Sequence, residues 1–115
     1  MDPFDTSGVP PVLVTLLTPW LNAIEISASG IGEHVTATAA HSFMALRRRI
    51  ELTPSLEQAL ADARAATDTL ATAIDRRRVV PLWIRDAVRK AMIDLIAALR
   101  RAEPNAVTRE LGLGW

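Results

Sequence analysis

Three consecutive arginines lead into a short apolar stretch in the segment AIDRRRVVPLW, residues 73–83. Guanidinium groups bind phosphates, so a basic helix face over residues 76–101 would suit a nucleic acid. That range holds eight basic side chains and two acidic ones. However, no aromatic residue stands among the three arginines, and the spacing matches neither a helix-turn-helix motif nor a zinc finger. The candidate phosphate contacts are Arg76, Arg77, Arg78, Arg85 and Arg89.

A structural role explains the arginine triplets more simply. The triplets at 47–49 and 76–78 both fall where a helix is expected to end. A cation there offsets the negative end of the helix dipole and can bind free carbonyl groups. We therefore prefer the structural interpretation and keep a small nucleic-acid-binding regulator as the alternative.

The histidines and acidic residues do not form a catalytic or metal-binding pattern. His34 and His41 are seven residues apart, which places them about 10 Å apart along a helix, too far to share one metal ion. Ser42 follows His41 directly, and neighbouring helical residues point in different directions, so the two make no nucleophile–base pair. We expect a protein that is not an enzyme and that needs no metal or cofactor.

Four aromatic residues are candidate contacts with a partner protein. Trp20 and Trp83 come one and two residues after a proline and are expected in the first turn of a helix, where packing in the core at a bundle end is the usual role and a partner contact is the alternative. Phe4 and Trp115 lie near the two termini, where an aromatic side chain on a flexible segment can anchor a partner. Whether Trp115 packs on its own bundle or on another chain stays open.

Composition points to an all-α protein. Half of the 115 residues are hydrophobic, and 19 alanines and 12 arginines favour helices. A formal net charge of zero gives no long-range attraction to polyanions. The chain has no cysteine, an acidic N-terminal segment unlike a secretory signal, and an apolar run at 9–24 that three prolines interrupt. We expect a cytoplasmic protein without a membrane span, with the Ala/Arg-rich composition common in GC-rich bacterial genomes.

Apolar spacing predicts two helices in the second half of the chain, at about 54–78 and 81–103. Thr53 is a good helix cap, and Pro54 suits the first helical position. In both helices the apolar positions follow steps of four and three residues, which is the pattern of a buried helix face. These positions are Leu56, Leu60, Ala63, Thr67, Leu70 and Ile74 in the first, and Ile84, Val88, Ala91, Leu95, Ala98 and Ala102 in the second.

The first half of the chain allows two interpretations. Thr18-Pro19 repeats the Thr-Pro signal of a helix start, and apolar residues keep one helical phase from Ile24 to Ile50. Gly30 and Gly32 interrupt this stretch, and each costs about 1 kcal/mol relative to alanine. Because the phase continues across the glycines, we favour one long helix at about 19–51 over two helices with a break at 30–32.

Together these patterns predict an antiparallel, up-down bundle of three helices, with a fourth short element as an alternative. We expect a flexible arm at 1–10, the bundle at 11–103 and a tail at 104–115. The long first helix and the many apolar positions exceed what three helices can bury. We therefore expect a non-catalytic interaction module that self-associates or serves as a small subunit of a larger protein assembly.

Overall fold

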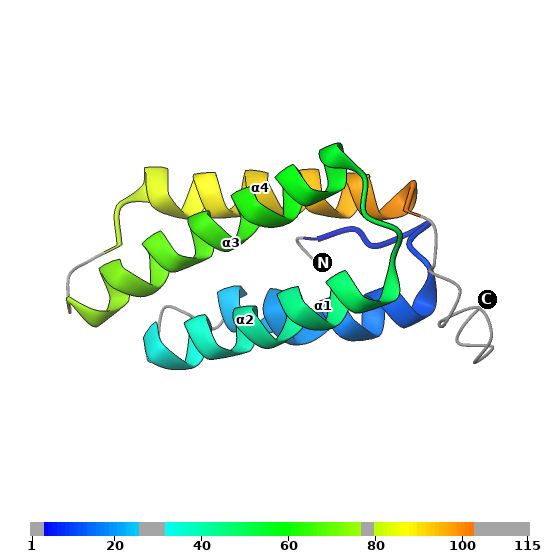
Figure 1. The fold of residues 1–115 in the computed structure, drawn as a ribbon. Coiled ribbons are helices and arrows are strands. Elements are labelled where there is room, and N and C mark those ends of the chain that lie inside the picture. The colour runs from blue at the N-terminus through cyan, green and yellow to red at the C-terminus, as the bar shows by residue number, and fades with distance from the viewer. Residues whose placement is uncertain (1–3, 26–31, 77–79, 103–115) are drawn as a thin grey trace.

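Four α-helices run through residues 4–25, 32–76 and 80–102, the ranges that the computed structural model describes. Consecutive helices run in alternate directions, and α1 and α2 form one layer while α3 and α4 form the second (Figure 1). Each helix packs against the next one in the chain. The prediction of an all-helical, up-down bundle is therefore confirmed. The helices are α1 (Pro11–Glu25), α2 (Gly32–Arg49), α3 (Pro54–Asp75) and α4 (Leu82–Arg100).

The preferred prediction of one helix over 19–51 is wrong. α1 ends at Glu25, α2 begins at Gly32, and the two helices pack against each other. A hairpin of two helices buries the apolar face of each, whereas a single long helix would extend beyond its partners. The apolar spacing nevertheless continues, because the predicted positions from Val35 to Ile50 are the buried side of α2 and the residue that follows it. Residues 26–31 lie outside the described ranges.

The helix start predicted at Thr18-Pro19 is also wrong, because α1 begins earlier and Pro19 lies inside it. The carbonyl of Pro10 accepts the first helical hydrogen bonds, from the N–H groups of Leu13 and Val14 at 2.9 and 3.1 Å. The Thr18 hydroxyl caps nothing and donates instead to the carbonyl of Val14 at 2.7 Å. Burial of one face of α1 outweighs the hydrogen bond that Pro19 cannot make.

The second half of the chain follows the sequence pattern closely. Thr53 has extended backbone angles (φ −104°, ψ 160°), and its hydroxyl accepts a hydrogen bond from the Leu56 N–H at 3.2 Å. α3 and α4 stay within the predicted ranges and end three residues before the predicted ends. Of the predicted positions, Leu56, Leu60, Ala63, Thr67 and Leu70 are buried in α3, and Ile84, Val88 and Leu95 in α4.

Trp20 connects the two layers through the centre of the core. Its side chain is fully buried, and its indole N–H donates to the Thr67 hydroxyl at 3.0 Å. The Thr67 hydroxyl in turn donates to the carbonyl of Ala63 at 2.7 Å. Both polar groups are therefore satisfied in a site without water access, and α1 is joined to α3. Of the two roles expected for Trp20, packing in the core and contact with a partner, this burial agrees with the first and leaves no surface for the second.

The Thr67 hydroxyl should contribute measurably to stability. Thr67→Val keeps the shape of the side chain and leaves the buried indole N–H without an acceptor. We expect the free energy of unfolding to fall by about 1–3 kcal/mol, measured by urea denaturation.

Thr69→Val is the matched control. The Thr69 hydroxyl makes the same kind of bond, to the carbonyl of Ala65 at 3.1 Å, but on the exposed side of α3. Its loss should change the free energy of unfolding by less than about 0.5 kcal/mol. Equal effects of the two substitutions would show that the Trp20–Thr67 bond contributes nothing specific.

Candidate interaction site

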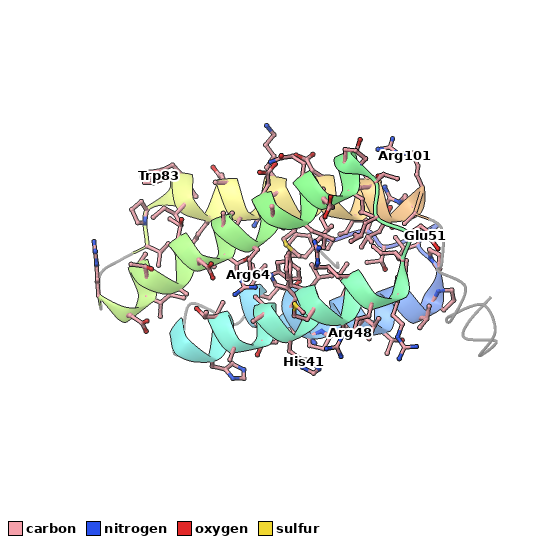
Figure 2. All side chains as sticks on the ribbon, in the orientation of Figure 1. His41, Arg48, Glu51, Arg64, Trp83 and Arg101 are labelled. Carbon is pink, nitrogen blue, oxygen red and sulfur yellow. The ribbon has the colours of Figure 1, made fainter. Side chains whose placement is uncertain are left out.

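The outer face of α4 carries exposed apolar side chains, among them Trp83, which the sequence had offered as a candidate partner contact. Leu82, Trp83 and Ile93 are 72%, 67% and 48% exposed, respectively. Trp83 lies at the beginning of α4, at the end of the bundle far from Arg101 (Figure 2). The other exposed large apolar residues in the described part of the chain, Met44 and Leu52, lie in α2 and in the segment between α2 and α3.

Charged residues surround these apolar side chains on α4. Asp86, Arg89, Lys90 and Asp94 are all exposed, and they combine both signs of charge on the outer face. An apolar centre with a charged surround is the usual anatomy of a protein interface. The sequence contained one signal of this face, since Ile93 falls outside the buried stripe of its helix.

The structure brings together only part of the basic set proposed for nucleic acid. Arg85 and Arg89 stand one turn apart on α4, half-buried and exposed, respectively. Arg76 is exposed beyond the end of α3, where its backbone N–H bonds to the carbonyls of Thr72 and Ile74. Arg77 and Arg78 lie outside the described ranges. Arg85 and Arg89 share this part of α4 with the carboxylate of Asp86, so the face carries charges of both signs.

Arg85 and Arg89 also border a small pocket of about 190 Å³. Its apolar lining comes from Phe4, Ile24, Leu70 and Val88, and Glu25 adds a negative charge. Small-molecule sites usually measure about 300–1,000 Å³, so this pocket is small for a ligand.

Arg47 shows how one arginine of the other triplet serves the fold. Its guanidinium lies 5.5 Å from the centre of the Phe43 ring, and the guanidinium of Arg64 lies 5.3 Å from the same ring. Arg47 also pairs with Glu57 at 3.4 Å. These contacts link α2 to α3, which supports a structural role for Arg47.

Phe4 is a core residue, contrary to the prediction of a flexible arm over 1–10. Residues 4–10 lie against the bundle, and the side chains of Phe4 and Val9 are 3% and 7% exposed. In Figure 1 this segment runs between the two helical layers. Burial of two apolar side chains offsets the entropy lost when the segment becomes ordered. Phe4 therefore offers no surface to a partner.

Arg100 fastens this N-terminal segment to the end of α4. Its Nε donates to the carbonyl of Ser7 at 2.7 Å, and its Nη2 donates to the carbonyl of Asp5 at 2.6 Å. The backbone turns at Gly8, whose φ of 82° favours glycine, and the stem of Arg100 lies beside it. Since the chain separates these residues by more than ninety positions, no local pattern could predict the contact.

The Asp5 carboxylate has a lowered pKa in this segment. Hydrogen bonds from Ser7 are the main cause, including one from its backbone N–H at 2.9 Å, and Arg100 adds a smaller electrostatic contribution. A lowered pKa means that the charged carboxylate stabilises the folded segment. This contribution is complete above the ordinary value of 3.8 and disappears as the pH falls through the lower, folded-state pKa.

The remaining sequence candidates are placed as follows. His34 and His41 both point to solvent from α2, and the described residues contain no group of three or more potential metal ligands. None of the four helices, within the ranges described, is long and apolar enough to cross a membrane. Trp115 and the tail at 104–115 lie outside those ranges, so the structure does not place them.

Comparison with protein-family models, with curated proteins and with solved structures finds no match to this chain. Its function must therefore be argued from its own residues.

Arg100→Met should release the N-terminal segment while keeping most of the apolar stem. The Val9 N–H, which donates to the carbonyl of Thr6 at 3.1 Å, should then exchange with deuterium about tenfold faster, which corresponds to ~1.4 kcal/mol. Hydrogen exchange followed by NMR or mass spectrometry measures this. Arg101→Met is the control, since the Arg101 side chain makes no hydrogen bond or ion pair with residues 4–10. Unchanged exchange in Arg100→Met would mean that apolar burial alone holds residues 4–10.

Proposed function

We propose that the chain is a non-catalytic helical interaction module that binds a protein through the outer face of α4, by self-association or as a small subunit of a larger assembly. The observation that carries this proposal is the exposure of Leu82, Trp83 and Ile93 on a helix whose opposite side forms the core. Two of the four aromatic candidates, Phe4 and Trp20, are used inside the fold. Of the three aromatic candidates within the described residues, Trp83 alone has an exposed side chain.

Burial of this face would yield a useful binding energy. Removing a large apolar side chain from water contributes about 1.5–3 kcal/mol, and tryptophan is enriched among the residues that dominate protein interfaces. The charged residues around Trp83 would stay hydrated at the edge of the contact and add specificity. A cytoplasmic location in a bacterium belongs to the same proposal, supported by the cysteine-free, Ala/Arg-rich composition.

A nucleic-acid-binding regulator has less support. Arg85, Arg89 and Lys90 provide positive charge on α4, but Asp86 and Asp94 lie among them. A carboxylate beside a phosphate contact opposes binding, so the mixed face suits a protein better than a polyanion.

Trp83→Ser should weaken binding at least tenfold if the α4 face is the contact. Sedimentation velocity over about 1 to 200 µM measures self-association. For a different partner, the soluble variant competes with immobilised wild-type chain for the captured protein, and its potency is compared with that of soluble wild-type chain. Met44→Ser is the matched control, because Met44 is 47% exposed on α2, in the other layer of the bundle. The proposal fails if the chain stays monomeric and no captured protein depends on Trp83.

Binding to DNA and RNA separates the two functions. With both signs of charge on α4, we expect no measurable binding at low salt, tested by fluorescence anisotropy at about 50 and 200 mM salt. Tight binding at low salt that falls steeply at high salt would favour the nucleic-acid alternative.

A further inference from the structure

Four exposed residues form a single stripe along the outer face of α4. Leu82, Asp86, Arg89 and Ile93 follow one another in steps of four, three and four residues, which keeps them on one side of a helix. Read from the N-terminal end, the stripe is apolar, acidic, basic and apolar. Within the described part of the chain, neither Asp86 nor Arg89 belongs to an ion pair.

This order is complementary to itself when two copies of the helix lie antiparallel. Leu82 then faces Ile93 of the second copy, and Asp86 faces Arg89 of the second copy. Both pairs are centred between residues 87 and 88, so one two-fold axis creates all four contacts. Apolar side chains meet apolar ones, and each charge meets its opposite.

A parallel arrangement lacks this complementarity. It would place Asp86 against Asp86 and Arg89 against Arg89, and like charges at facing positions are destabilising. The charge pattern therefore selects the antiparallel direction. Trp83 and Lys90 border the stripe, where the ring adds apolar area and the ammonium group lies near Asp86 of the second copy.

We propose that the partner of the α4 face is a second copy of this chain, bound antiparallel about a two-fold axis between residues 87 and 88. The inference rests on the proposed function, because it names the partner for that face. A pair of single helices buries less than the 1,200–2,000 Å² typical of stable interfaces. The dimer is accordingly weak, with a dissociation constant in the micromolar range or above.

Charge exchange tests the pairing directly. Asp86→Arg places four arginines at the centre of the dimer, and Arg89→Asp places four aspartates there. Sedimentation equilibrium should show dimerisation at least tenfold weaker for each variant alone. An equimolar mixture of the two variants should dimerise within about threefold of wild type, because each Arg then faces an Asp. Both positions are exposed, and circular dichroism checks that each variant keeps its helices.

Cysteine crosslinking tests the register independently, since the chain has no cysteine of its own. A mixture of Leu82→Cys and Ile93→Cys chains should form a disulfide-linked dimer under mild oxidation. Each variant alone should crosslink poorly, because identical positions lie about 16 Å apart along the paired helices, beyond the ~7 Å limit between Cα atoms.

The outcomes distinguish this inference from the proposed function. If Trp83→Ser abolishes binding but the mixed charge variants fail to associate, the antiparallel dimer is overturned and another partner occupies the face. If the wild-type chain stays monomeric to about 1 mM, the dimer is overturned as well. If, in addition, no partner depends on Trp83, the proposed function falls with it.

Discussion

The buried indole N–H of Trp20 sets a constraint that the rest of the bundle must meet. Apolar stripes can slide or rotate against each other at moderate cost, but an N–H in a dry core needs an acceptor at one place. Thr67 supplies that acceptor from the other layer, and its hydroxyl donates a hydrogen bond to the carbonyl of Ala63. The pair therefore fixes how α1 lies relative to α3, and the neighbouring helices pack around that relation.

The N-terminal segment, residues 4–10, adds two buried side chains to the core of the four helices. Phe4 and Val9 fill apolar space, and Arg100 holds the backbone of the same segment at the end of α4. The chain thus uses Phe4 and Trp20 internally. Among the described residues, three of the five exposed large apolar side chains lie on α4, and the functional proposal follows from that distribution.

α4 has two patterned faces with different roles. Its inner stripe, with Ile84, Val88 and Leu95, packs into the bundle. Its outer stripe has the order apolar, acidic, basic, apolar. This order is complementary to that of a second copy of the helix that runs in the opposite direction. Hydration of a surface helix requires only polar residues. The exposed apolar side chains of Leu82 and Ile93, one on each side of a charged pair, are therefore better explained by a partner that covers them.

By itself, the sequence determined the all-helical class, the limits of α3 and α4 within a few residues, and the Thr53 cap, because spacing, proline and a capping hydroxyl act over one or two helical turns. Only the tertiary structure decided that α1 and α2 are separate helices packed against each other, since a continuous apolar phase suits one helix or a hairpin equally. It also decided the fates of Trp20 and Trp83. Both follow a proline closely, yet one is buried and one exposed, because burial depends on neighbours that are distant in the chain.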